Sequence, residues 1–142
     1  MEKLLNKLSF LRGSWSGEGF VIDFTEPVYN MMFGSMQKAN EVGEVVHWET
    51  YRFEERDNHV FLYPSQMGEE SGVYVMTQSD STDTGFVFEA FINKQTPIQA
   101  IYFQPIDSNN GELLFGLKGE MEGRTFEKEW SLHRRTASFH IG

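Results

Sequence analysis

A histidine and a glutamate stand two residues apart in a run of alternating polar and apolar residues. His47 and Glu49 would project side by side from one face of a β-strand, because successive side chains on a strand point to opposite faces. Imidazole and carboxylate groups at this spacing can provide two ligands of a metal ion. A metal site needs a third ligand and usually a fourth, and no second histidine-rich strand offers them. The sequence therefore favours a hydrogen-bonded His–Glu pair, and no metal ion is expected.

Four charged residues lie within otherwise apolar segments: Glu49, Arg52, Glu89 and Glu129. A buried charge requires a partner, and an arginine–carboxylate network across the interior would supply one. The same groups could instead orient the polar end of a bound ligand. The structural network is the favoured interpretation. If a ligand binds, Glu49 and Arg52 are the predicted polar anchors.

Aromatic residues are abundant, with 13 Phe, 5 Tyr and 3 Trp in 142 residues. Such residues favour strands, and inside a barrel they either fill the interior or line a ligand cavity. A methionine in the wall would adapt to varied apolar ligands, although ordinary core packing is the simpler interpretation. The residues predicted to line an apolar cavity wall are Trp15, Met36, Tyr51, Phe88, Tyr102 and Trp130.

Signatures of enzymes are mostly missing. The segment Gly13-Ser14-Trp15-Ser16-Gly17 superficially matches a nucleophile elbow, but its central residue is tryptophan rather than serine. The sequence contains neither a phosphate-binding glycine loop nor a dinucleotide fingerprint. Adjacent carboxylates such as Glu69 and Glu70 indicate exposed turns rather than an acid–base pair. No catalytic residue is therefore predicted, and catalysis is the least supported class of function.

The elements that position these residues are mostly short strands. Leucines at positions 4, 5, 8 and 11 have helical spacing, so residues 4–11 are expected to form a helix that caps a barrel end. The pattern then changes to a period of two, with turn residues at regular intervals. Strands are predicted at 14–24, 30–39, 44–56, 59–64, 72–79, 85–92, 98–105, 112–122 and 124–134. This pattern indicates an all-β fold, a single antiparallel barrel domain over residues 1–142 with about eight to ten strands.

The segment 85–92 carries apolar side chains on both faces, since Phe86 and Phe88 alternate with Val87. We therefore expect its outer face to be covered, either by the N-terminal helix or by a second copy of the chain. A filled barrel that forms a homodimer is accordingly one alternative to a ligand-binding protein.

Charge and composition narrow the classes of partner. The chain has 12 Lys and Arg against 21 Asp and Glu, a formal net charge of −9, so nucleic acid and anionic membrane surfaces are unfavourable partners. The absence of cysteine excludes disulfides and thiolate sites and is compatible with a reducing compartment. The N-terminal residues lack the apolar run of a signal peptide. A cytoplasmic location is therefore expected.

Four short motifs follow one another between about residue 8 and residue 134. They are Gly13-x-Trp15-x-Gly17-Glu18, Gly34-Ser35-Met36, Glu49-x-x-Arg52-x-Glu54 and Glu129-Trp130. In order and spacing these motifs resemble a family of small bacterial proteins with a lipocalin-like, calycin-type barrel, a family whose function is not established. The resemblance implies a lipocalin-like β-barrel and binding of a small molecule.

One segment departs from that family. Its members commonly carry a His-Asp-Phe-Pro segment before an Ile-x-Tyr strand, whereas this chain has Lys94-Gln95-Thr96-Pro97 before Ile101-Tyr102. Pro97 and Tyr102 match, but the His and Asp are absent. If that pair carries an activity in the relatives, this protein is expected to lack it.

The spacing of glycines and tryptophan in residues 13–19 also resembles the opening of nitrobindin-type haem barrels. Those proteins bind iron through a histidine near the end of the chain, and the late histidines here are His133 and His140. Haem binding is thus a further alternative. The leading hypothesis is a binding protein that holds a small apolar or amphipathic ligand in a barrel cavity and needs no cofactor.

Overall fold

Strands make up most of the computed structural model, which describes residues 3–79, 85–92, 97–107 and 111–135. Within these ranges there are eleven strands and one 3₁₀ helix, η1 (Leu4–Leu11). The strands are β1 (Gly13–Gly17), β2 (Phe20–Phe24), β3 (Met31–Ala39), β4 (Val45–Arg56), β5 (His59–Gln66), β6 (Glu69–Glu70), β7 (Val73–Ser79), β8 (Phe86–Ile92), β9 (Ile98–Asp107), β10 (Glu112–Met121) and β11 (Arg124–Arg134). No helix in the described part of the chain has the length and hydropathy needed to cross a membrane.

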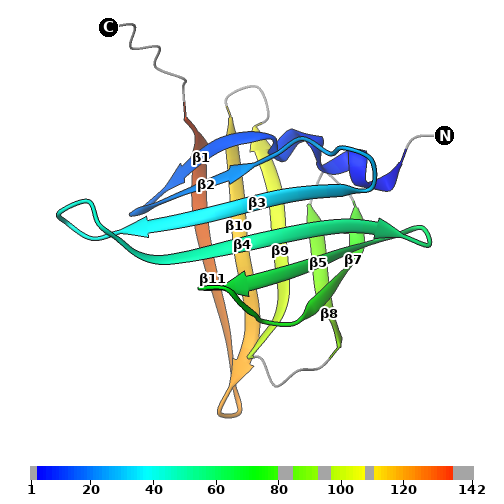
Figure 1. Ribbon diagram of the computed structural model, residues 1–142. Coiled ribbons are helices and arrows are strands. Elements are labelled where there is room, and N and C mark those ends of the chain that lie inside the picture. Colours follow the sequence, from blue (N-terminus) through cyan, green and yellow to red (C-terminus); the bar gives the residue numbers. More distant parts are fainter. Residues whose placement is uncertain (1–2, 80–84, 93–96, 108–110, 136–142) are drawn as a thin grey trace, which may run out of the picture.

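The strands form one antiparallel sheet that closes on itself (Figure 1). Neighbours in the chain are neighbours in the sheet, and β1 pairs with β11 to join its two ends. The two-residue strand β6 only extends the edge of β5, which also pairs with β4 and β7, so ten of the described strands form the wall. The predicted all-β antiparallel barrel with a short N-terminal helix is confirmed. Closure leaves the wall without the unpaired edges of an open sheet.

The first strands of the barrel differ from the prediction. The predicted single strand 14–24 is wrong, because β1 and β2 are separate strands that pair with each other across a tight turn at Glu18 and Gly19. Gly19 has a φ of +83°, a left-handed conformation that glycine adopts at little cost. The sequence pattern also does not reveal β6, whose two glutamates are both exposed. The other predicted strands agree with the structure to within two residues at each end.

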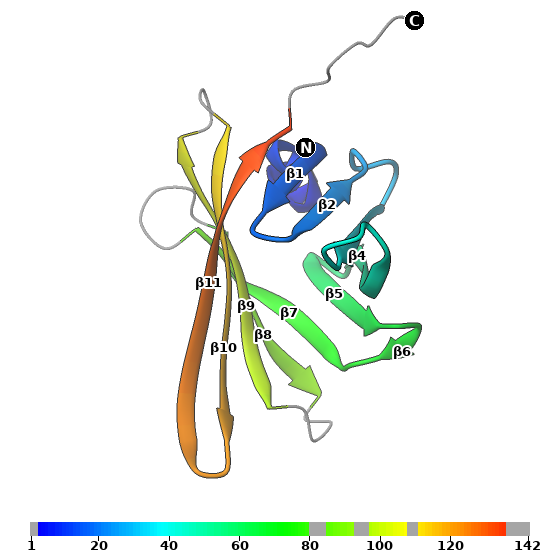
Figure 2. The same ribbon diagram turned by 90° about the vertical axis from the view of Figure 1, so that its left-hand side faces the viewer.

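One end of the barrel is closed by η1 (Figures 1 and 2). Leu5, Leu8 and Leu11 are fully buried, and their three-residue spacing places them on one side of a 3₁₀ helix, which has three residues per turn. The backbone N–H of Leu5 donates a 2.8 Å hydrogen bond to Oε1 of Glu55 on β4. The indole Nε1–H of Trp15 donates another of 2.8 Å to the carbonyl oxygen of Leu11. The predicted capping helix therefore exists, with tighter winding than an α-helix.

Aromatic rings fill the half of the barrel next to η1. The ring of Phe103 lies at the centre, with the rings of Phe24, Phe53, Phe88 and Phe115 at centroid distances of 5.2 to 6.2 Å. These side chains belong to the same core cluster as the buried leucines of η1. This half of the interior is therefore packed with side chains.

The outer face of β8 is not covered by the helix. Phe10 of η1 stacks on Phe86 at 5.1 Å, and Phe86 is buried on the inner face of the strand. On the outer face, Phe91 is 58% exposed and makes an edge contact with Phe61 at 5.4 Å. The expectation that η1 covers this face is wrong, because its leucines dock into the barrel end. Coverage by a second copy stays a prediction.

Candidate functional site

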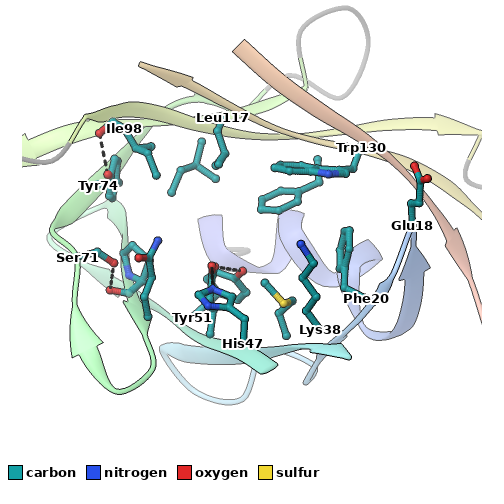
Figure 3. Close-up of a pocket in the computed structure, with 16 residues that line it drawn as sticks. Glu18, Phe20, Lys38, His47, Tyr51, Ser71, Tyr74, Ile98, Leu117 and Trp130 are labelled. Atoms are coloured by element: carbon teal, nitrogen blue, oxygen red, sulfur yellow. Dashed lines mark hydrogen bonds and ion pairs between the residues drawn. The ribbon is translucent and has the colours of Figure 1, made fainter. Parts of the chain in front are cut away.

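A cavity of about 240 Å³ occupies the half of the barrel away from η1 (Figure 3). Its walls come from most strands of the barrel, so residues far apart in the sequence face one another across it. The residues that line the cavity are Glu18, Phe20, Met36, Lys38, His47, Glu49, Tyr51, Pro64, Gln66, Ser71, Tyr74, Ile98, Ile101, Phe115, Leu117 and Trp130.

One wall of the cavity is aromatic and aliphatic. Trp130 on β11 stacks on Phe115 of β10, with ring centroids 5.6 Å apart and planes inclined by 26°. Phe20 of β2 meets Trp130 edge to face at 6.1 Å. Leu117 extends the same surface along β10, and Ile101 adds to it from β9. This wall offers a flat apolar surface against which a ring or short alkyl chain can pack.

The facing wall carries a row of polar groups on the inner side of β4. Because side chains alternate along a strand, His47, Glu49 and Tyr51 all point inward. The Tyr51 hydroxyl donates a 2.7 Å hydrogen bond to Oε1 of Glu49, and Nε2 of His47 lies 2.8 Å from Oε2 of the same carboxylate. Both carboxylate oxygens therefore have partners within the protein.

Burial raises the pKa of the Tyr51 phenol well above its ordinary value, and the negative charge and hydrogen bond of Glu49 raise that pKa further. Tyr51 is only 3% exposed, whereas the Glu49 side chain is 18% exposed and reaches the water-accessible part of the cavity. The phenol is thus a fixed neutral donor at physiological pH, which holds the carboxylate in one position.

The mouth of the cavity contains a cationic group. Lys38 on β3 lies directly opposite His47 in the strand register, and Figure 3 shows its side chain directed into the cavity. Within the described residues, no hydrogen bond or ion pair engages the Lys38 ammonium. Glu18, in the turn between β1 and β2, lies at the edge of the cavity next to Phe20 (Figure 3).

Other polar groups of the lining are used within the fold. The hydroxyl of Tyr74 donates a 2.8 Å hydrogen bond to the carbonyl oxygen of Ile98, and that of Ser71 donates one of 3.1 Å to the carbonyl oxygen of Pro64. These bonds fix the side of the cavity formed by β5, β7 and β9. Among the residues that the structure describes, Lys38 is then the strongest donor that faces the cavity without a protein partner.

The structure brings together four of the eight predicted site residues. Met36, Glu49, Tyr51 and Trp130 all line the cavity, on strands β3, β4 and β11. Their role in binding stays a prediction, but their positions agree with it.

Two other predicted residues lie in the filled half of the barrel. Trp15 is 2% exposed and its indole is bonded to Leu11 of η1, so it supports the cap rather than the cavity. Phe88 is fully buried against Phe53 and Phe103. Both face inward as expected, but they lie too far toward η1 to reach the hollow half.

The remaining two, Arg52 and Tyr102, lie on the outer surface of the barrel. Arg52 pairs with Glu54 at 2.7 Å and stacks over the ring of Tyr63, with the guanidinium carbon 4.0 Å from its centroid. The predicted arginine–carboxylate network across the interior is therefore wrong. Arg52 and Glu49 are three residues apart on β4, and an odd spacing places two side chains on opposite faces.

Tyr102 lies over Gly116 of the next strand, on the outside of the wall. Its hydroxyl is 2.7 Å from a carboxylate oxygen of Glu127 and 2.5 Å from one of Glu129. Burial raises the pKa of the Tyr102 phenol, and its bonds to Glu129 and Glu127 raise it further. Glu129 therefore acts on the outer surface and not inside the barrel. The other predicted inward candidate, Glu89, is exposed and bonded to Thr77.

Among the described residues, no additional ligand groups support a metal site or a haem site. In the ranges that the structure describes, no three His, Asp or Glu side chains gather where they could hold a metal ion, and His47 and Glu49 bond to each other. The side chain of His133 is 59% exposed, 3.9 Å from Glu112, and does not line the cavity. His140 and the segment Lys94-Gln95-Thr96 lie outside the described residues.

Several residues that line the cavity are not among the site residues predicted from the sequence. Lys38 follows Met36 by two positions, so the alternation of β3 places both on the inner face and would have identified it. Phe115 and Leu117 likewise share the face of β10 that alternation assigns inward. Pro64 has no such signal, because β5 is buried at consecutive positions on both faces. In β7 the burial alternates, but the apolar run from Val73 to Met76 hides that alternation in the sequence.

The sequence was compared with protein-family models and with curated proteins, and neither comparison found a match. The shape and chemistry of the cavity are therefore the basis on which a function can be assigned.

Proposed function

We propose that this protein binds a small, mostly apolar molecule with one polar end inside the barrel. The observation that carries the proposal is the hollow half of the barrel, in which an aromatic wall faces a fixed polar row. Trp130 and Phe115 supply the apolar surface, and Glu49 and Tyr51 lie in the polar row. Sites for small molecules have this composition, with mostly apolar walls and a few placed polar groups.

The size of the cavity limits the ligand. At about 240 Å³ the cavity is just below the range of about 300–1,000 Å³ that is typical of sites for drug-sized ligands. This size favours a compact ligand, a single ring with a short polar arm, over a long-chain lipid.

The resemblance of the motifs to lipocalin-like bacterial barrels supports the same class of function. Closed antiparallel barrels of this size are able to hold one small ligand in the interior. A lipocalin-like, calycin-type ligand-binding protein is thus the specific form of the proposal.

Binding can be tested with 3-phenylpropanol, a neutral molecule with one ring and one hydroxyl. Saturation-transfer NMR and calorimetry should detect binding to the wild-type protein. Leu117→Trp places a bulky ring in the cavity and should abolish binding. Leu114→Trp adds the same bulk to the opposite face of β10 and serves as the matched control. Equal binding by wild type and Leu117→Trp would contradict a site inside the barrel.

Self-association is a second candidate function, favoured by apolar side chains on the outer surface of β4. Val46 is 53% exposed, Trp48 is 38% exposed, and Met67 beside Trp48 is 50% exposed. Contiguous apolar surface of this kind often marks an interface. Sedimentation velocity should then show a dimer that Trp48→Glu dissociates, whereas a monomer at every concentration would remove this candidate.

A further inference from the structure

We propose that the natural ligand is an anion, a compact acid whose carboxylate or similar group pairs with the Lys38 ammonium while its apolar body packs on Trp130 and Phe115. This proposal rests on the proposed function and specifies the chemical class of the ligand. It depends on which charged groups of the cavity already have partners and which do not.

The carboxylate of Glu49 already has two partners within the protein. Tyr51 occupies one of its oxygens at 2.7 Å and His47 occupies the other at 2.8 Å. These two contacts use about half of the lone-pair sites of the carboxylate. The capacity of Glu49 to accept further bonds from a ligand is therefore reduced.

The ammonium of Lys38 differs from the carboxylate of Glu49 in this respect. Its side chain is directed into the cavity (Figure 3), and no carboxylate within the described residues forms an ion pair with its ammonium. His47 stands directly across from it on β4, with its Nε2 in contact with Glu49. The ammonium has three hydrogens to donate, and a carboxylate ligand would accept them as charge-assisted hydrogen bonds.

The arrangement of the walls fits an amphipathic acid in one orientation. Lys38 extends from β3, and Trp130 lies on the other side of the cavity (Figure 3). An acid group at Lys38 therefore places the attached ring against the stacked pair of Trp130 and Phe115. Glu18 lies at the edge of the cavity, and no ion pair joins it to Lys38 in the described part of the chain.

The overall charge of −9 opposes approach of an anion from solution. Lys38 lies at the mouth of the cavity and is itself exposed, so water partly screens its attraction for an acid. Affinity for an acid should therefore depend on this one lysine, since the protein as a whole does not attract anions.

Three probes with the same ring and chain length test the proposal: 3-phenylpropionate, 3-phenylpropanol and 3-phenylpropylamine. At pH 7.5 and low salt, calorimetry and saturation-transfer NMR should show tightest binding of the acid to the wild-type protein. Lys38→Gln should weaken binding of the acid severalfold, the effect of losing an exposed ion pair, and leave binding of the alcohol unchanged. Lys38→Glu should reverse the order and favour the amine.

Lys118→Gln is the matched control, because it removes the same charge from the outer face of β10, where Lys118 lies over Tyr102. It should leave all three affinities unchanged. Equal affinity for acid and alcohol, or an acid affinity that Lys38→Gln does not change, would overturn the anion proposal and leave the proposed function intact. If none of the three probes binds the folded wild-type protein, the proposed function fails and the anion proposal fails with it.

Discussion

The Tyr51 hydroxyl donates a 2.7 Å hydrogen bond to Glu49, its neighbour on the inner face of β4. The phenol is buried and the carboxylate is near the water-accessible cavity. This bond ties the packed half of the barrel to the polar row of the hollow half, because Tyr51 also stacks on Phe24 with centroids 6.4 Å apart. Tyr51 therefore positions the polar wall from the core side.

The raised pKa of Tyr51 makes stability depend on pH in the alkaline range. In the unfolded chain a tyrosine titrates near pH 10, so below that pH both states hold the proton and this group does not make stability depend on pH. Above about pH 10 the unfolded state loses its proton while the folded state keeps it, so the free energy of unfolding falls as the pH rises. Urea unfolding from pH 8 to 11 should show this slope.

The variant Tyr51→Phe should flatten that slope, although it lowers stability at neutral pH by the loss of a hydrogen bond. Tyr102, whose pKa is also raised, contributes in the same direction and persists in the variant. An unchanged slope in Tyr51→Phe would mean that the phenol ionises as freely in the folded protein as in the unfolded chain.

The bond from Trp15 to η1 should contribute measurably to stability. Trp15→Phe keeps an aromatic ring but removes the donor, so the buried carbonyl oxygen of Leu11 loses its partner. The expected loss is about 1–3 kcal/mol in the free energy of unfolding. Trp48→Phe, at an exposed position, should cost much less. Chemical denaturation of the two variants provides the comparison, and equal losses would argue against the bond.

The leucines of η1 should behave as core residues. Leu8 is fully buried, so Leu8→Ala should cost about 2–5 kcal/mol through lost burial and the space left behind. Leu4, at the start of the same helix, is only partly buried, and Leu4→Ala is expected to have a smaller effect. Denaturant unfolding measures both. Similar small effects at the two positions would indicate that η1 does not dock into the barrel.

Gly116 should be required for the position of Tyr102. A methyl group at 116 would overlap the phenol ring of Tyr102, which the bonds to Glu127 and Glu129 hold in place. We expect Gly116→Ala to destabilise the fold by about 1–3 kcal/mol through overpacking. In a Tyr102→Ala background the same substitution should be neutral or stabilising, and thermal unfolding of the four proteins of this cycle decides the matter.

Alternation along single strands accounts for much of what could be predicted. It places His47, Glu49 and Tyr51 on one face of β4, and these three residues do form one row. The same rule places Arg52 and Glu49 on opposite faces of β4, so the two could not both be polar anchors inside the barrel. The split of residues 14–24 depends on the turn at Gly19, a local detail that periodicity does not reveal.

The depth of each residue along the barrel could not be predicted. Trp15 and Phe88 face inward as Trp130 does, yet the first two lie in the packed half and the third lines the cavity. Depth depends on how strands are staggered around the closed sheet, which is a property of pairing between distant segments. The burial of Tyr102 could not be predicted either, because it depends on side chains on the outer surface of neighbouring strands.

The sequence by itself determined that the chain forms short antiparallel strands, because turn residues and a period of two are local properties. Only the tertiary structure decided which faces point inward, since a two-residue period does not distinguish the two sides of a strand. It also decided that the rings around Phe103 fill one half and leave a hollow beside Lys38 and Trp130. The space that remains depends on the packing of side chains from distant strands, and no single segment contains that information.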